Sequence, residues 1–465
     1  MLILWAYHLN KVMSAMNSRL LEKYNVPAPR YTSYPTVPYW QKEKPDAIAW
    51  QTRVVNAFAE NNEISLYIHL PFCEALCTYC GCNKRITKNH AVETPYIKAV
   101  LQEWQLYLDL LPEKPVLREL HLGGGTPTFF SPESLDYLLS NILAGVDLAE
   151  EYEFGFEAHP GSTSRAHLET LFNLGFTRLS IGVQDFAPEI MHIINRHQTQ
   201  EQVVEVTQMA REIGYQSINY DLIFGLPLQT PEHIRTNMAL LAELRPERLA
   251  FYSYAHVPWI KPSQRAYSEE DLPKGAEKRA LYELGRELLE EIGYREIGMD
   301  HFALPGDSLY EALETGTMHR NFMGYTPFYT RLNLALGVSS ISDSWDAYVQ
   351  NEKHIETYQE IVARGEFPII KGHLLSEEDQ VLRQHILNIM CRFETAWPCP
   401  EQCAPALFEG LERLEEPLHD GLVTIDGHRL HVTEKGWPFI RNICLALDAR
   451  YWAKRPEGKL FSQVV

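Results

Sequence analysis

The sequence predicts an α/β fold in which six strand–helix units form a partial (β/α)6 barrel of the TIM type. Two observations support this prediction. From about Ser65, short apolar runs alternate with amphipathic stretches, which is the pattern of parallel strands joined by crossover helices. The polar motifs of this region also follow the carboxyl ends of the predicted strands, where ligands collect in parallel α/β folds. Six units are too few to close an eightfold barrel, so we expect an open one.

The expected elements alternate along the chain. The strands are predicted at Ser65–Leu70, Arg118–Leu122, Tyr152–Ala158, Arg178–Val183, Ser217–Ile223 and Arg248–Tyr254. The helices are predicted at Thr94–Leu111, Pro132–Leu143, Arg165–Leu174, Gln200–Ile213 and Pro231–Leu244, several of them opened by Thr, Ser or Pro. A long helix at Lys274–Ile292 and a strand near Tyr294–Met299 would extend the barrel.

Composition shifts divide the chain into three parts. We expect an N-terminal extension at 1–60, the barrel at 61–345 and a mainly helical domain at 346–465. The last part contains helical segments at Glu377–Asn388 and Pro405–Leu414, then a hairpin at Leu422–Val432 that turns at Asp426-Gly427. Helices followed by a hairpin resemble a winged-helix module, and the alternative is a lid packed on the barrel.

Charge and hydropathy exclude several classes of protein. The chain has 465 residues, a net charge of −19 and no apolar stretch near eighteen residues. This acidity argues against general affinity for nucleic acid or a membrane surface. Nothing at the N-terminus resembles a signal peptide, so we expect a cytoplasmic protein whose eight cysteines do not form a disulfide framework.

Half of the cysteines lie in one run, Cys73-Glu-Ala-Leu-Cys77-Thr-Tyr-Cys80-Gly-Cys82. The spacing of Cys73, Cys77 and Cys80 fits a loop around a cubane iron–sulfur cluster with one iron lacking a protein ligand. A zinc site would need distant ligands such as Cys399 and Cys403, and a ferredoxin-type carrier would need a fourth cysteine ligand. Both alternatives remain open at this point.

A glycine run, Gly123-Gly124-Gly125-Thr126-Pro127-Thr128, directly follows the second predicted strand. Glycines allow bare backbone to approach a ligand closely, and the alternative is a tight strand-to-helix turn. The run lacks the Lys of a phosphate loop and the spacing of a dinucleotide fingerprint. Beside an open iron, it predicts a backbone cradle for an amino acid ammonium group.

Five motifs together resemble the oxygen-independent coproporphyrinogen III oxidases of the radical S-adenosylmethionine (SAM) superfamily. They are the cysteine run, Gly123–Thr126, Gly182–Phe186, Tyr220–Pro227 and Gly298–Ala303. The resemblance extends from Arg30–Pro35 to Arg441–Cys444. The segments Arg30–Pro35 and His319–Phe322 narrow it from the superfamily to this family.

The resemblance implies a radical SAM barrel with a 4Fe-4S cluster on Cys73, Cys77 and Cys80, while Cys82 stays unligated. SAM would chelate the open iron, and one electron would cleave it to a 5′-deoxyadenosyl radical. That radical would take hydrogen from two propionate side chains of a tetrapyrrole, which become vinyl groups with loss of CO2. The product would be protoporphyrinogen IX, for haem synthesis.

The same resemblance assigns roles to individual residues. It implies catalytic roles for Tyr67, His69 and Glu157. It implies contacts to two SAM molecules for Tyr67, Tyr79, Gly124, Gly125, Thr126, Glu157, Gln184, Arg196, Asp221, Ala255 and Ile341. Segment 30–35 would gate the substrate, and we expect Arg30, Tyr31, Arg320 and His69 to handle its carboxylates. A reduced flavodoxin or ferredoxin would donate electrons, and we expect a monomer.

The chain departs from the family pattern at three positions. Met323 stands where Gln is usual, Arg331 lies in a loop that usually carries an acidic residue, and His159 replaces a usual Asp. We expect Met323 and Arg331 to lie near the second SAM molecule and the substrate. These departures keep two alternatives open: another radical SAM enzyme on the same scaffold, such as a tetrapyrrole decarboxylase or methylating paralogue, and a non-enzymatic haem-handling protein.

Overall fold

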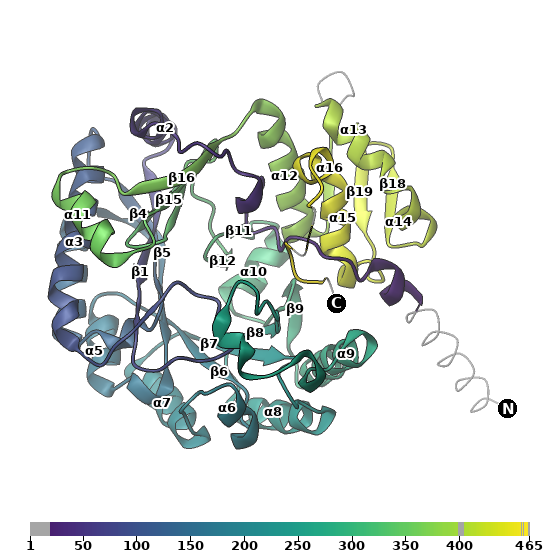
Figure 1. Cartoon of the computed structure of the whole chain (residues 1–465), viewed down its shortest axis with the longest axis horizontal. Helices are drawn as coiled ribbons and strands as arrows, with labels where there is room; N and C mark the ends of the chain where they lie inside the picture. Colours follow the sequence, from purple (N-terminus) through teal and green to yellow (C-terminus); the bar gives the residue numbers. More distant parts are fainter. Residues whose placement is uncertain (1–18, 399–403, 457, 459, 464–465) are drawn as a thin grey trace.

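A twelve-stranded sheet organises the chain in the computed structural model, which describes residues 19–398, 404–456, 458 and 460–463 (Figure 1). The strands lie in the order β16-β15-β14-β13-β1-β4-β5-β6-β7-β8-β10-β9. Because this order has two unpaired ends, β16 and β9, the barrel is open. The predicted partial α/β barrel is therefore confirmed.

The six predicted strands form the parallel centre of the sheet. They are β1 (Glu63–Leu70), β4 (Val116–Gly124), β5 (Asp147–Ala158), β6 (Arg178–Gln184), β7 (Ser217–Phe224) and β8 (Arg248–Ser253). Leu66, Ile68 and Leu120 on neighbouring strands have no exposed surface. Such nearly continuous apolar runs are typical of strands buried on both faces.

Apart from the strand near Tyr294–Met299, the sequence did not predict the strands that widen this sheet. β13 (Leu332–Leu336) pairs parallel to β1, and the other added strands pair antiparallel at the two sides. These are β14 (Ile341–Asp343), β15 (Ala347–Asn351), β16 (Ile369–Leu374), β10 (His301–Ala303) and β9 (Arg295–Gly298). The strand predicted near Tyr294–Met299 is thus present as β9, but it joins the sheet through β10.

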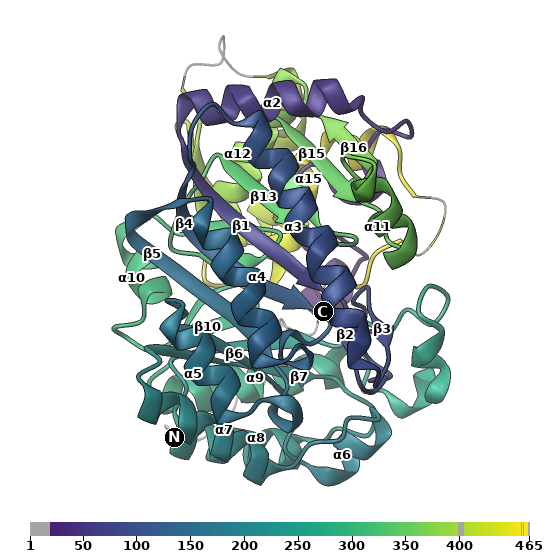
Figure 2. The ribbon, with the colours of Figure 1, turned by 90° about the vertical axis from the view of Figure 1, so that its left-hand side faces the viewer.

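Helices cover the outer face of the parallel strands, as Figure 2 shows for α3 and α4. The helices between strands are α3 (Glu93–Leu110), α4 (Pro132–Ala144), α5 (Arg165–Asn173), α6 (Pro188–Ile193), α7 (Gln200–Ile213) and α8 (Pro231–Leu244), followed by α9 (Gly275–Glu291). The predicted starts of α4, α5 and α7 are confirmed. Ser131, Ser164 and Thr199 precede these helices and accept hydrogen bonds from backbone N–H groups of the first turn.

The sheet continues past residue 345, where the sequence placed the domain boundary. β15 and β16 pair with each other and β15 pairs with β14, while α11 (Ile355–Ala363) packs on α3. The strand at Ala347–Asn351 lies at the start of the part expected to be mainly helical, and no strand was predicted there, so local sequence did not reveal this pairing. The first element that belongs to the C-terminal part is α12 (Glu377–Arg392).

The C-terminal part combines helices with a small antiparallel sheet in the order β17-β19-β18. Its elements are α12, β17 (Glu394–Ala396), α13 (Pro405–Glu412), α14 (Glu415–His419), β18 (Val423–Asp426), β19 (Arg429–Val432), α15 (Ile440–Leu447) and α16 (Ala449–Ala453). The hairpin turns at Gly427-His428, one residue later than predicted, because Asp426 pairs with Arg429.

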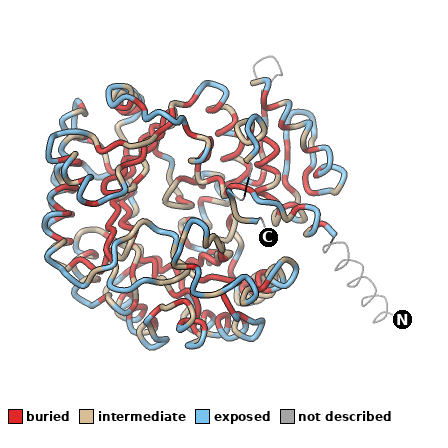
Figure 3. The backbone as a smooth tube through the Cα atoms, viewed as in Figure 1, coloured by how far each residue is buried: buried red, intermediate tan, exposed pale blue. Residues whose placement is uncertain are grey.

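The N-terminal segment crosses between these two parts. Tyr31 and Tyr34 are buried in the apolar core of the C-terminal helices, and α2 (Ala47–Glu60) packs on β13 and β15. Smaller elements complete the chain: β2 (Phe72–Cys73), β3 (Arg85–Ile86), α10 (Ser308–Thr315), β11 (His319–Asn321) and β12 (Gly324–Thr326). Figure 3 shows that buried residues follow the sheet and the inner sides of the helices.

No helix among the described residues is long and apolar enough to cross a membrane.

Candidate active site at the carboxyl ends of the strands

A cavity of about 560 Å³ opens at the carboxyl ends of β1 and β4 to β7. Most of the predicted site residues line it, although they come from separate strand ends. They are Cys73, Cys77, Tyr79, Cys80, Gly124, Gly125, Thr126, Glu157, Gln184, Arg196 and Asp221. Parallel strands bring their carboxyl ends to one edge, which explains why distant motifs meet here.

The cysteine loop is anchored on both sides. At its start, β2 pairs parallel with β3, and at its centre the N–H of Thr78 donates to the Ile194 carbonyl at 2.9 Å. The Asn195 side chain donates to the Leu76 carbonyl at 2.7 Å. The loop is therefore held against the segment that follows α6.

Each of the three thiols has a hydrogen-bond donor beside it. Thr126 Oγ1 lies 3.4 Å from Cys73 Sγ, and Arg196 Nη1 lies 3.6 Å from Cys77 Sγ. A hydrogen bond from Cys82 lowers the pKa of Cys80. Burial raises the pKa of Cys73 to about 11, although the Thr126 hydrogen bond acts in the opposite direction. The donors stabilise the thiolate form that iron–sulfur clusters require, while burial opposes it at Cys73.

The residues present fit an iron–sulfur cluster better than a single ion. Among the described residues, no group of three or more His, Cys, Asp or Glu side chains converges on one metal ion. In a cubane each thiolate binds a different iron, so the sulfur atoms of Cys73, Cys77 and Cys80 need not meet at one point. Cys399 and Cys403, the distant ligands of the zinc alternative, lie outside the described residues.

The glycine run fits tightly against the first strand. A Cβ atom on Gly125 would lie 2.6 Å from the Pro71 carbonyl carbon, and one on Gly124 would lie 2.6 Å from the His69 ring. Gly124 also has a φ of +115°, which side-chain-bearing residues rarely adopt. Only glycine therefore lets the end of β4 pass this close to β1 while lining the cavity.

Tyr67 and His69 lie beneath the glycine run and do not line the cavity. The Tyr67 hydroxyl lies 3.2 Å from His69 Nδ1, and His69 Nε2 lies 2.9 Å from the Asn83 carbonyl. Since a carbonyl only accepts, Nε2 carries the proton and Nδ1 accepts from Tyr67. Burial lowers the pKa of His69, so the ring stays neutral. Both side chains lie close to the glycine run, Tyr67 at Gly123 and His69 at Gly124, and their catalytic roles stay a prediction.

Glu157 projects from the end of β5 into the cavity. One oxygen accepts the N–H of Gly124 at 3.2 Å, and the other lies 3.7 Å from His121 Nε2. Burial alone would raise the pKa of Glu157, but His121 and the Gly124 amide hold it below its usual value. Glu157 is therefore an ionised carboxylate at the cavity wall, suited to an ammonium group or a ribose diol.

Asp221, on β7, is held differently. It accepts hydrogen bonds from Ser180 Oγ at 3.2 Å and from Asn219 Nδ2 at 2.9 Å. Burial, together with the nearby charge of Glu157, raises the pKa of Asp221 to about 6. The protein thus favours the charged form of Glu157 and disfavours the charged form of Asp221.

Arg196 joins the cysteine loop to β6. Its guanidinium donates to the Gly182 carbonyl, to the Tyr79 hydroxyl at 3.3 Å and to the Gln198 side chain at 2.8 Å. A guanidinium with these fixed partners keeps its charge beside the cysteines.

The cavity wall also contains residues that the motifs did not assign. These are Lys84, Lys88, His197 and Tyr252, together with His159, one of the three departures. His159 Nδ1 accepts the N–H of Gly161 at 3.0 Å. Burial and the charge of Arg196 lower the pKa of His159 to about 3, so this side chain is neutral where an Asp would be charged. Position could have indicated Lys84 and Lys88, which follow the cysteine run, and His159, which follows β5, whereas Tyr252 lies within β8 and His197 follows α6.

Besides Tyr67, two predicted SAM contacts, Ala255 and Ile341, do not line this cavity. Ala255 follows β8 and lines a neighbouring cavity of about 490 Å³. Its carbonyl accepts from Gln264, whose amide also reaches the Tyr79 carbonyl at 3.0 Å, so the two loops are linked. Ile341 begins β14 and packs on the apolar cluster of Trp40 and Tyr348.

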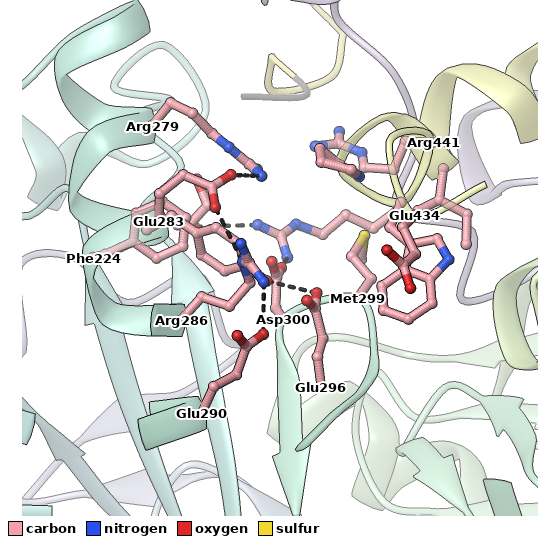
Figure 4. A pocket seen from close by; sticks show the side chains of 16 residues that line it. Phe224, Arg279, Glu283, Arg286, Glu290, Glu296, Met299, Asp300, Glu434 and Arg441 are labelled. Atoms are coloured by element: carbon pink, nitrogen blue, oxygen red, sulfur yellow. Dashed lines mark hydrogen bonds and ion pairs between the residues drawn. The ribbon is translucent and has the colours of Figure 1, made fainter. Parts of the chain in front are cut away.

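The predicted substrate residues lie apart from the cavity. Arg30 pairs with Asp300 at 2.9 Å and lines another cavity of about 390 Å³, in which Arg279 on α9 and Arg441 on α15 point toward each other (Figure 4). The Tyr31 hydroxyl is buried and donates to Asp448 at 3.0 Å. Arg320 lies in β11, 5% exposed.

The expectation that Arg331 lies near the second SAM molecule is wrong. Arg331 directly precedes β13, and Leu332 pairs with Ile64 near the start of β1. Its Nε lies 3.1 Å from Glu60 at the end of α2. Arg331 therefore lies at the amino edge of the sheet, opposite the cavity. Met323 lies in the turn between β11 and β12, where its N–H donates to Asn321.

Comparisons with known proteins agree with this site. The radical SAM superfamily profile matches residues 67–241, which contain the cysteine run, the glycine run, Glu157 and Asp221. The oxygen-independent coproporphyrinogen III oxidase of Pseudomonas aeruginosa is 37% identical over 457 residues, covering 96% of this chain and 98% of that protein. The enzyme of that name from Synechocystis sp. is 35% identical over 458 residues, covering 97% and 98%.

A solved structure gives the same result in three dimensions. Coproporphyrinogen III oxidase from Escherichia coli, described as a radical SAM enzyme, superposes with a TM-score of 0.85 and 36% identity, covering 90% of this chain and 97% of that one. Because similarity at this level extends over nearly the full length of both chains, the protein belongs to the family of oxygen-independent coproporphyrinogen III oxidases within the radical SAM superfamily.

Proposed function

We propose that this protein converts two propionate side chains of coproporphyrinogen III to vinyl groups without oxygen, giving protoporphyrinogen IX in haem synthesis. The observation that supports this most strongly is the meeting of Cys73, Cys77 and Cys80 with the glycine run and two carboxylates around one cavity. The near full-length similarity to enzymes that carry this name supports the substrate.

We propose that the three cysteines hold a 4Fe-4S cluster whose fourth iron is left for the amino and carboxylate groups of SAM. When bound, cluster and SAM together supply a carbon-centred radical able to remove hydrogen from a propionate. The protein holds SAM in place: Glu157, Thr126 and the Gly124 and Gly125 backbone line the cavity wall. Tyr67 and His69 support that backbone from below.

A second SAM molecule is part of the proposal. It is supported by a second group of polar side chains that line the cavity: Gln184 at the end of β6, Arg196 after α6 and Asp221 on β7. Tyr79 and Ala255, linked through Gln264, and Ile341 at the same edge of the sheet would complete its surroundings. The neutral His159 lines the same cavity and would alter the charge that this second molecule meets.

We propose that a flavodoxin- or ferredoxin-type protein reduces the cluster, that the chain acts as a monomer and that it acts in the cytoplasm. The proposed electron donor is supported by the position of the cysteine loop at the surface, where Gly81 and Cys82 are exposed. A one-electron donor can approach such a loop without opening the barrel.

The direct test uses the whole chain with its cluster rebuilt under anaerobic conditions. SAM, a reductant and coproporphyrinogen III are added, and protoporphyrinogen IX, CO2 and 5′-deoxyadenosine are measured. We expect all three products. Deoxyadenosine without a vinyl product would indicate another radical SAM reaction, and neither product together with tight haem binding would indicate a haem carrier.

A further inference from the structure

Among the described residues, Arg320 is a buried cation without an anionic partner. The residue is 5% exposed, and its Nε and Nη1 are buried and form no hydrogen bond. Its remaining nitrogen, Nη2, lies 3.5 Å from the Arg30 carbonyl, the limit of a hydrogen bond. A buried guanidinium in this state is costly unless an acceptor reaches it.

The neighbours of Arg320 do not supply that acceptor. Its guanidinium lies over the Tyr325 ring at 4.4 Å, and the Tyr325 hydroxyl is already engaged with the Met390 carbonyl at 3.0 Å. The carboxylate of this region, Asp300, pairs with Arg30 at 2.9 Å. The ring therefore orients Arg320 without neutralising it.

Arg383 shows how this fold treats a buried arginine with a structural role. It is 4% exposed and also lies over aromatic rings, Trp345 at 4.2 Å and Tyr348 at 4.9 Å. Unlike Arg320, it donates to Asp343 at 3.0 Å and to the Trp345 carbonyl at 2.6 Å. The two arginines match in burial and stacking and differ in the carboxylate.

A continuous row of side chains joins Arg320 to the cavity. Tyr252 lines the cavity, and its hydroxyl lies 3.3 Å from His301 Nε2. The His301 ring lies 5.0 Å from the Tyr325 ring, over which Arg320 is placed. Burial and the charge of Arg320 lower the pKa of His301 to about 4, so the row between cavity and arginine is uncharged.

We propose that Arg320 binds a carboxylate of the tetrapyrrole substrate, on the side of the cavity away from the cysteine loop. This inference rests on the proposed function and narrows it, because it separates Arg320 from the other predicted substrate residues. Arg30 is paired with Asp300, the Tyr31 hydroxyl donates to Asp448, and His69 donates to the Asn83 carbonyl. An arriving propionate supplies both the negative charge and the acceptor oxygens that the guanidinium lacks. The methionyl carboxylate of SAM has the same chemistry, so the test must separate the two sources.

The test compares Arg320→Gln and Arg320→Lys with the control Arg383→Gln in the full chain. Coproporphyrin III, which carries the same four propionates, is titrated by fluorescence, and SAM is titrated separately. A charge-assisted hydrogen bond contributes about 1.5–3 kcal/mol, so Arg320→Gln should weaken coproporphyrin III binding by about 10- to 150-fold. Arg320→Lys should recover part of the affinity, and SAM affinity should not change.

Thermal stability without ligand separates binding from structure. Arg320→Gln removes an unpaired buried charge, so its unfolding midpoint should stay or rise, whereas Arg383→Gln leaves Asp343 unpaired and should lower it. Unchanged coproporphyrin III affinity in Arg320→Gln, or a midpoint as low as that of Arg383→Gln, would overturn the inference. Weakened SAM binding instead would assign the carboxylate to SAM. If the wild type binds coproporphyrin III through Arg320 but forms no vinyl product, the proposed function fails and the inference stands.

Discussion

At the scale of single residues, the site depends on Gly125, which has no space for a side chain, whereas Gly81 in the nearby cysteine loop has space for one. Gly125 has no room for a Cβ atom, because backbone atoms of Pro71 and Phe72 lie 2.6–2.8 Å from that position. Gly81, in the cysteine loop, has nothing within 4 Å and no positive φ. The nearest atoms to that position are all backbone atoms, so no flexible side chain can move aside. A methyl group on residue 125 must therefore push the end of β4 away from the end of β1.

We therefore expect Gly125→Ala to weaken SAM binding at least tenfold and to lower the retention of the cluster. Gly81→Ala is the matched control, and it should leave both unchanged. Iron and sulfide content after anaerobic reconstitution, followed by SAM titration, measures the two effects. Equal behaviour of the two variants would refute this account of the glycine run.

Asp221 makes a prediction about pH. Its pKa is about 6 in the folded protein against an ordinary 3.8, because of burial and the charge of Glu157. The folded state therefore holds this proton more tightly than the unfolded state, and stability falls as pH rises from about 4 to 6. Above pH 6 the full cost, about 1–3 kcal/mol, is present.

Asp221→Asn should accordingly raise the unfolding midpoint at pH 7 and give no gain below pH 4, while SAM binding weakens. Thermal unfolding of the cluster-free chain between pH 4 and 8 measures this difference. A gain that is the same at every pH would show that ionisation of Asp221 is not the cause.

At the scale of elements, Arg248 locks the amino edge of the barrel. From the start of β8 it donates to Glu153 of β5 at 2.9 Å and to Asp307, the N-cap of α10, at 2.6 Å. Although burial alone would raise the pKa of Glu153, Arg248 and Arg178 lower it to about 2. This contribution to stability is complete above about pH 4.5 and is lost as pH falls toward 2.

Arg248→Gln should destabilise the protein by about 3–5 kcal/mol, because two buried carboxylates, Glu153 and Asp307, lose the arginine that they share. Arg295→Gln, whose pair with Glu314 spans 3.8 Å at the surface, is the control and should cost less than about 1 kcal/mol. Thermal unfolding at pH 7 compares them. A similar small effect in both would mean that the buried network contributes little.

At the scale of the whole molecule, the two ends of the chain hold each other. Arg441 on α15 donates to the carbonyls of Pro29 at 3.0 Å and Gln463 at 2.9 Å. Pro27 and Gln463 form an isolated bridge. Because Arg441 bonds to carbonyls on both sides, the C-terminal tail fixes the start of the segment that contains Arg30 and Tyr31.

Ending the chain after Leu460 should therefore speed hydrogen exchange in peptides covering residues 24–35 while leaving peptides of α9 unchanged. Exchange measured by mass spectrometry reports both regions in one experiment. Substrate turnover should fall more than SAM binding, since the cavity lies elsewhere. Unaltered hydrogen exchange at residues 24–35 would contradict the inference that the C-terminal tail fixes this segment.

The sequence by itself determined the parallel centre of the barrel and the content of its site. Apolar runs, capping residues and strand-end motifs are local signals, and they predicted the six strands and brought the cysteine loop, the glycine run and Glu157 to one edge of the sheet, whereas Asp221 was assigned by the family resemblance. For these motifs, position at a strand end was enough, because parallel strands share one edge.

Only the tertiary structure decided what depends on distant pairing. β13 joins β1 across more than 260 residues of sequence, and this register moves Arg331 to the edge opposite the cavity. The same folding pairs Arg30 with Asp300 and leaves Arg320 buried without a carboxylate. Whether a buried charge finds a partner depends on which distant residue the fold brings next to it. The local sequence around the charge does not contain that residue.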